Sequence, residues 1–251
     1  MTERTAKQFC GVMLLTLAVT LFCLLFVCNS AKGATWTFTI PASEINDTYI
    51  NGYPTSRGVN YDNTSTLQLG YSTGDRSTII GSPYISDSLA NHNGTLDSFK
   101  IVLKYGVRFS DFIDGDSVKV TMNALKVIPI TTEATDSCYA YGYPWQTLGA
   151  YGATDQYTPV ESDGVHGDSV IVKYATVVAG DSLTLWGKPA HASQEWWIVR
   201  GTVMAVSADA RFYLWATEKT TTSLKPYMVF YGTVSAPPVT YTAKTIVGVK
   251  K

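Results

Sequence analysis

Beyond residue 34, apolar and polar side chains alternate with a period of two, and this alternation limits the chain to few folds. From Phe99 to Phe109 the odd positions are Phe, Ile, Leu, Tyr, Val and Phe, whereas the even positions include Lys100, Lys104 and Arg108. Successive side chains of a β-strand point to opposite faces, so this segment is predicted to be a strand with one buried face. Beyond the N-terminal segment, no stretch has the spacing of an amphipathic helix.

Further short strands are predicted between clusters of Gly, Asp, Asn or Pro, which favour turns. They are Trp36–Ile40, Thr48–Ile50, Thr66–Leu69, Val118–Ile128 with a bulge near Ala124, Val170–Tyr174, Leu183–Trp186, Trp196–Val206, Arg211–Trp215 and Tyr227–Val234. About ten short strands with turns between them are typical of an antiparallel β-sandwich of jelly-roll type. We therefore predict that residues 34–235 form one all-β sandwich.

Residues 1–33 have a different pattern, that of a hydrophobic targeting helix. Arg4 and Lys7 precede an uncharged, mostly apolar run from Phe9 to Val27, and Ala31-Lys32-Gly33 is a usable cleavage site. The run exceeds a signal-peptide core of about 7 to 15 residues and approaches the roughly 20 residues that span a bilayer. This segment is therefore either a cleaved export signal or a retained membrane anchor, and the protein is expected to be secreted or displayed at the cell surface.

The charge and the cysteines exclude several classes of protein. Residues 1–33 hold three of the 19 basic and one of the 20 acidic residues, so the remainder has a small net negative charge. This balance predicts no binding to nucleic acid, and contact with a membrane only through an uncleaved N-terminal segment. Cys138 is the one cysteine beyond residue 33, so no disulfide can form within the domain. Residues 236–251 are expected to be a flexible tail or an added edge strand.

Two long segments without clear alternation, Asn51–Asp62 and Glu133–Gly167, are candidates for a functional site. The second contains the aromatic residues Tyr139, Tyr141, Tyr143, Trp145, Tyr151 and Tyr157. Sugar rings pack on exposed aromatic faces, so the first five of these residues are predicted to form a glycan-binding platform. The alternative is that these rings fill the core, and Trp145 is the member expected most strongly to do so. In the adjacent pair Trp196-Trp197, one ring is expected in the core and the other can lie at the surface.

Several short motifs follow one another along most of the chain beyond residue 45. They are Asn46–Ile50 (NDTYI), Asn60-Tyr61, Ser65–Gly70 (STLQLG), Thr95–Leu103 (TLDSFKIVL), Pro144–Ala150 (PWQTLGA) and Lys225–Tyr231 (KPYMVFY). In their sequence and their order they resemble the DNRLRE domain, an extracellular β-sandwich family. The sequence departs from the family at Asp75–Gly81 and in the loop before Pro144. The resemblance implies a secreted or surface-displayed module that binds carbohydrate or has a structural role, and it implies no catalytic residue.

No cofactor is predicted except a structural Ca²⁺, for which Asp47 and Asp62 are candidate oxygen ligands. Asp and Asn clusters in β proteins are more often turn formers, so the turn-forming role stays an alternative. The three histidines are widely separated, and no cysteine pair exists beyond residue 33, which argues against a transition-metal site. Neither a nucleophile elbow nor a phosphate loop is present, and the chain is not expected to be an enzyme.

These observations favour a secreted or cell-surface carbohydrate-binding module without catalysis, whose partner is a polysaccharide or glycan. The alternative is a structural or adhesive surface protein that self-associates or binds other envelope components. The absence of an attached catalytic domain, to which a binding module would bring substrate, favours the alternative.

Overall fold

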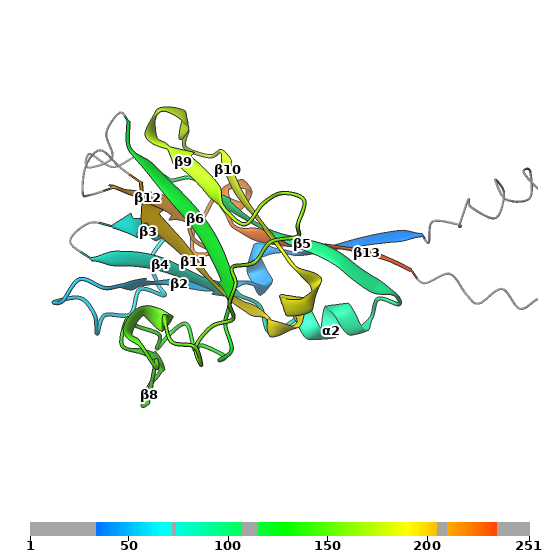
Figure 1. Cartoon of the computed structure of the whole chain (residues 1–251), viewed down its shortest axis with the longest axis horizontal. Helices are drawn as coiled ribbons and strands as arrows, with labels where there is room; N and C mark the ends of the chain where they lie inside the picture. Colours follow the sequence, from blue (N-terminus) through cyan, green and yellow to red (C-terminus); the bar gives the residue numbers. More distant parts are fainter. Residues whose placement is uncertain (1–33, 72–73, 107–114, 205–209, 235–251) are drawn as a thin grey trace, which may run out of the picture. The chain divides into compact units, whose positions relative to one another are not determined.

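A computed structural model describes residues 34–71, 74–106, 115–204 and 210–234. The strands within these ranges all belong to one compact unit, Thr35–Thr233. Every strand pairing in it is antiparallel, and the strands form two main sheets (Figure 1). The prediction of an all-β fold built from antiparallel sheets is therefore confirmed.

Sheet A has four strands in the order β1-β13-β5-β10. The strands are β1 (Thr35–Ile40), β13 (Tyr227–Thr233), β5 (Thr95–Lys104) and β10 (Ser182–Gly187). The alternation that predicted β5 corresponds to its two faces, because Phe99, Ile101 and Leu103 are fully buried. Lys100 and Lys104 on the opposite face are half-buried.

Sheet B has seven strands, in the order β12-β3-β4-β11-β6-β9 with β2 paired to β4. The strands are β12 (Ala210–Trp215), β3 (Thr66–Tyr71), β4 (Asp75–Gly81), β11 (Trp196–Val203), β6 (Ser117–Ala124), β9 (Val170–Lys173) and β2 (Asn46–Asn51). Strand β4 is central, because it pairs with β11, β2 and the end of β3.

The main core combines alternate residues of sheet A with alternate residues of sheet B. Its largest fully buried side chains include Trp197, Phe99, Phe212 and Phe230. The rings of Phe99 and Trp197 lie 4.8 Å apart between centroids, so strands of the two sheets are in direct contact.

A second core covers the other face of sheet B. Ile50, Ile79 and Ile198 point away from the main core. They pack against Leu125, Ala134, Trp145 and Ala150 of the long segment after β6, which is residues 125–169 between β6 and β9. This segment also carries the short hairpin of β7 (Cys138–Ala140) and β8 (Tyr143–Pro144), seen at the lower edge of Figure 1. Sheet B is therefore buried on both faces here, and the long segment is a structural layer as well as a connection.

Several local predictions are wrong. Trp196 and Trp197 are both buried, at 4% and 0% exposure, because each face of β11 has its own core. No bulge occurs near Ala124: β6 ends there in regular register with β11, and Leu125 turns into the second core. A short helix, α2 (Ile85–Ala90), was not expected.

The predictions for residues 1–33 and 236–251 lie outside the described residues. Among the residues that are described, no helix combines the length and the apolar character needed to cross a membrane.

Candidate functional site

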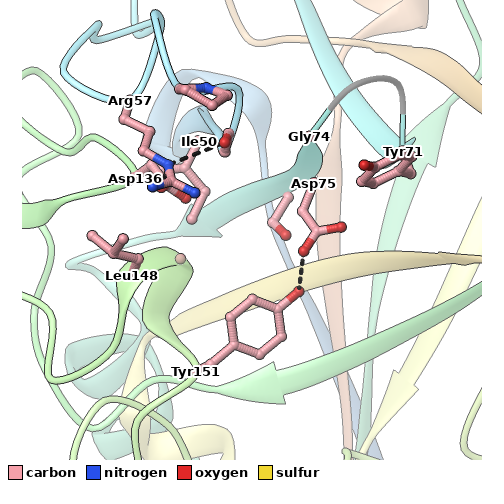
Figure 2. A pocket seen from close by; sticks show the side chains of 12 residues that line it. Ile50, Arg57, Tyr71, Gly74, Asp75, Asp136, Leu148 and Tyr151 are labelled. Atoms are coloured by element: carbon pink, nitrogen blue, oxygen red, sulfur yellow. Dashed lines mark hydrogen bonds and ion pairs between the residues drawn. The ribbon is translucent and has the colours of Figure 1, made fainter.

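A concave site of about 250 Å³ lies at the end of β2, between the adjacent ends of β3 and β4 and the long segment after β6 (Figure 2). We call it the Tyr151 cavity. It is lined by Ile50, Gly52, Pro54, Arg57, Tyr71, Gly74, Asp75, Ser77, Asp136, Leu148, Gly149 and Tyr151. These residues come from β2, from the segment after β2, from β3 and β4, and from the long segment, so the cavity exists only in the folded chain.

One ion pair lines the cavity. The Nε atom of Arg57 lies 3.3 Å from Oδ2 of Asp136 and donates a hydrogen bond to the carbonyl oxygen of Gly52 at 3.1 Å. Burial raises the pKa of Asp136, Arg57 opposes that effect, and the charge of Asp75 adds to it. Both contacts are made by Nε, and the Arg57 side chain as a whole is 44% exposed.

A second polar pair, formed by Asp75 and Tyr151, lies apart from the first (Figure 2). The hydroxyl of Tyr151 donates a hydrogen bond to Oδ2 of Asp75 at 3.3 Å. Tyr151 is 47% exposed and Tyr71, at the end of β3, is 39% exposed. The cavity therefore combines two accessible aromatic rings with two carboxylates and one guanidinium.

Arg200 of β11 contacts two residues that line the cavity, Gly149 and Tyr151. Its guanidinium donates hydrogen bonds to the carbonyl oxygens of Gly149 at 2.9 Å and Ala150 at 2.8 Å, and to Oε1 of Gln156 at 3.1 Å. The ring of Tyr151 lies over the same guanidinium, 3.9 Å from its carbon to the ring centroid. Arg200 thus fixes both the backbone and the aromatic ring of the long segment, although it is itself only 7% exposed.

Gly149 and Ala150, whose carbonyl oxygens accept the hydrogen bonds from Arg200, both have a left-handed backbone conformation. Gly149 has φ of 74° and Ala150 has φ of 61°. The conformation is uncommon for a residue with a Cβ atom, and it persists where surrounding contacts fix it. Here the two hydrogen bonds from Arg200, together with the full burial of Ala150, provide such contacts.

The predicted platform residues do not lie together on one surface. Tyr141 and Tyr143 are 87% and 61% exposed at the β7–β8 hairpin, and Tyr139 is half-buried beside them. Trp145 is 5% exposed, in the second core, and its Nε1 donates to the carbonyl oxygen of Thr135. The burial of Trp145 agrees with its expected place in a core and removes it from any exposed platform. Of the five residues, only Tyr151 lines the cavity.

Arg57, Tyr71, Asp75 and Asp136 were not predicted as site residues from the sequence. Arg57 lies in the first of the two segments singled out as functional candidates, and Asp136 lies in the second. The lack of alternation in these two segments pointed to the regions that contain Arg57 and Asp136. It could not indicate which side chains of the two regions lie together in the fold.

The calcium candidates Asp47 and Asp62 do lie near each other, along a separate groove of about 390 Å³ that Glu218 also lines. Asp47 is 1% exposed, and both of its oxygens accept hydrogen bonds from Thr217, one from the backbone N–H and one from the hydroxyl. Within the described ranges, no three His, Cys, Asp or Glu side chains are grouped closely enough to hold a metal ion. The arrangement gives Asp47 a structural role in holding Thr217, in the turn that follows β12.

In the unaltered protein, Asp47 should make the free energy of unfolding fall as the pH rises above about 4, and Asp47→Asn is expected to reduce this fall. Burial, followed by the charge of Glu218, raises the pKa of Asp47 well above its ordinary value of 3.8. A raised carboxyl pKa contributes stability below the ordinary value, and that contribution is lost as the pH rises through the folded-state pKa. The measurement is the free energy of unfolding in urea across this range of pH.

The matched controls for this prediction are Glu218→Gln and Asp168→Asn. Glu218→Gln removes the charge that raises the pKa of Asp47, so it should reduce in part the dependence of the unfolding free energy on pH. Asp168→Asn alters an exposed carboxyl and should leave the dependence as it is. An unchanged pH dependence in Asp47→Asn would show that other carboxyls cause it.

Comparison with known proteins adds no relative: no family model matches the sequence, and no curated protein matches it. The resemblance to the DNRLRE domain thus stays a prediction.

Proposed function

We propose that the protein is a secreted or cell-surface carbohydrate-binding module without catalytic activity, and that its glycan binds in the Tyr151 cavity. The observation that carries the proposal is the pairing of accessible rings with free hydrogen-bonding groups in one concave site. Tyr71 and Tyr151 offer apolar ring surface, while Asp75 and Arg57 offer an acceptor and donors. Binding sites for small ligands typically combine such surfaces with a few convergent polar groups.

The size of the cavity is in keeping with a short ligand. Its volume of about 250 Å³ is below the range of about 300 to 1,000 Å³ of sites for drug-sized ligands. One sugar ring, at a chain end or on a branch, is therefore the expected occupant.

The setting of this site is also part of the proposal. We infer a jelly-roll arrangement of the two sheets, similar to that of the DNRLRE domain, and an N-terminal segment that exports the protein or anchors it at the cell surface. Such a location would place the cavity among extracellular polysaccharides. The motif order and the apolar run in residues 1–33 support this part of the proposal.

Removing either ligand-facing group is expected to weaken glycan binding by about tenfold or more, with little change in stability. Tyr71→Ala deletes an exposed ring, and Asp75→Ala deletes an exposed carboxylate. A glycan array would first identify a ligand, and calorimetric titration would then compare the variants with the unaltered protein. Thermal unfolding would show that each variant remains folded.

Tyr84→Ala and Tyr141→Ala are the matched controls, since both rings are exposed outside the cavity. Both should bind the glycan as the unaltered protein does. Loss of binding in Tyr141→Ala, with normal binding in Tyr71→Ala, would move the site to the β7–β8 hairpin and contradict the proposal.

The alternative function, a structural or adhesive surface protein, is favoured by one observation. Ile128, Ile130, Tyr141 and Tyr143 are 46% to 87% exposed on the long segment, and the backbone N–H of Ile130 donates to the carbonyl oxygen of Tyr139. Large exposed aromatic and aliphatic side chains are common at protein interfaces. Concentration-dependent assembly in sedimentation velocity, abolished by Tyr141→Ser with Ile128→Ser, would favour this function over glycan binding.

A further inference from the structure

Charged groups of both signs lie at the Tyr151 cavity: Arg57, Asp75 and Asp136 line it, and Arg200 lies behind its wall. Arg57 forms its ion pair with Asp136 across 3.3 Å. The guanidinium of Arg200 donates to the carbonyl oxygen of Gly149 and lies 3.9 Å from the centroid of the Tyr151 ring, and both of these residues line the cavity. Burial lowers the pKa of Arg200, and the nearby charge of Asp75 opposes that effect. Two positive and two negative groups thus surround one small volume, and their charges cancel.

The hydrogen-bonding atoms that remain free are also of both kinds. Asp75 uses one oxygen for the hydroxyl of Tyr151, and its other oxygen accepts no hydrogen bond within the part of the chain that the structure describes. Among the described residues, Arg57 is contacted only through Nε, so its two terminal nitrogen atoms can donate to a ligand. A ligand in this cavity therefore meets a free acceptor and free donors.

A charged ligand would satisfy only part of this arrangement. A carboxylate could pair with Arg57 but would lie close to Asp75 and Asp136, and an ammonium group could pair with Asp75 but would lie close to Arg57. Like charges placed close together in a partly desolvated site oppose binding. A hydroxyl both donates and accepts, so it can pair with either kind of group without adding charge.

We propose that the cavity selects an uncharged sugar ring and discriminates against uronic acids and amino sugars. This inference rests on the proposed function and specifies its ligand class. The two polar pairs, which Figure 2 shows apart from each other, would each take a different hydroxyl of the same ring, and the ring of Tyr151 would contact its C–H groups. Because the site has no excess charge, binding should depend only weakly on salt.

The test compares three classes of probe on the full mature chain: methyl glucoside, mannoside and galactoside as neutral probes, glucuronate as the anion and glucosamine as the cation. Binding is followed by NMR titration, with the amide signals of Asp75, Asp136 and Tyr151 as reporters. At least one neutral probe should bind about tenfold or more tightly than both charged probes. Its affinity should change by less than about twofold between low and high salt.

Two variants test the role of charge directly, because each removes one charge of known sign from the cavity. Asp136→Asn removes a negative charge, and it should shift the selectivity toward glucuronate by about fivefold or more. Arg57→Gln removes a positive charge and should shift the selectivity toward glucosamine. Both side chains lie at the cavity, and thermal unfolding identifies a variant that fails to fold, in which case Asp136→Ser or Arg57→Met replaces it.

The outcomes separate this inference from the proposed function. Tighter binding of a charged sugar than of every neutral probe, or selectivity that neither variant shifts, would overturn the inference and leave glycan binding intact. If no sugar of any class moves the reporter signals, while a neutral oligosaccharide array is also negative, the proposed function fails together with the inference.

Discussion

Replacing Arg200 with methionine is expected to destabilise the protein by about 3 to 5 kcal/mol. Methionine fills much of the same volume but donates no hydrogen bond. The carbonyl oxygens of Gly149 and Ala150, and the amide oxygen of Gln156, would each lose their donor. A buried acceptor left without a donor costs about 1 to 3 kcal/mol, and partial entry of water limits the sum. The measurement is the free energy of unfolding from urea titration.

The part of the chain that is destabilised in Arg200→Met can be identified, in addition to the size of the loss of stability. Limited proteolysis of Arg200→Met should cleave the long segment between β6 and β9 well before global unfolding, because Arg200 joins that segment to β11. Arg200→Lys keeps the charge but not the planar fork of donors, so it should lose less stability. Lys173→Met, at an exposed position of β9, should change stability by less than about 0.5 kcal/mol. A loss below about 1 kcal/mol in Arg200→Met would show that the long segment holds its place without this contact.

Strands with a clear alternation could be predicted from the sequence because burial on one face imposes that pattern. Strand β5 shows it, with Phe99 and Ile101 buried and Lys100 only half-buried between them. The prediction fails where that condition is absent. Strand β4 was missed although it is central, because its first half, Asp75–Thr78, is polar on both faces. Its buried polar residues have specific roles, such as Ser77, whose hydroxyl accepts a hydrogen bond from Arg200.

The second core was not predicted, although strand β11 carries a signal for it in the sequence. From Trp196 to Val199, β11 is apolar at every position, whereas a strand with one solvated face alternates. Such a run indicates burial on both faces, and it therefore required a layer over the far face of sheet B. The long segment after β6 supplies that layer. Its aromatic residues thus divide between the core, as Trp145 does, and the surface, as Tyr141 does.

The composition of the cavity could not be predicted from one sequence. Its charged residues, Arg57, Asp75 and Asp136, are separated by many residues, and no local motif links them. They meet because β2 and β4 pair in antiparallel register and because Arg200 fixes the long segment over their ends. Pairings of this kind depend on the whole topology, whereas a local pattern reports only the burial of its own strand.

Trp145→Ala is expected to cost about 3 to 5 kcal/mol and to weaken glycan binding as a consequence. Trp145 is the largest side chain that the long segment contributes to the second core, and its indole N–H donates to Thr135 at 2.9 Å. Its backbone N–H also donates to the carbonyl oxygen of Ser137. These two contacts lie on either side of Asp136, so Trp145 holds the cavity wall that carries the Asp136 carboxylate without touching the ligand itself.

Two variants separate the roles of Trp145. Trp145→Phe retains most of the apolar area but leaves the carbonyl oxygen of Thr135 without its donor, so it should cost about 1 to 3 kcal/mol. Tyr143→Ala removes a 61% exposed ring from the same hairpin and should cost less than about 1 kcal/mol. Unfolding in urea and calorimetric glycan binding would be measured on all three. If Trp145→Ala were as stable as Tyr143→Ala, the second core would not hold the long segment, and the cavity wall would need another support.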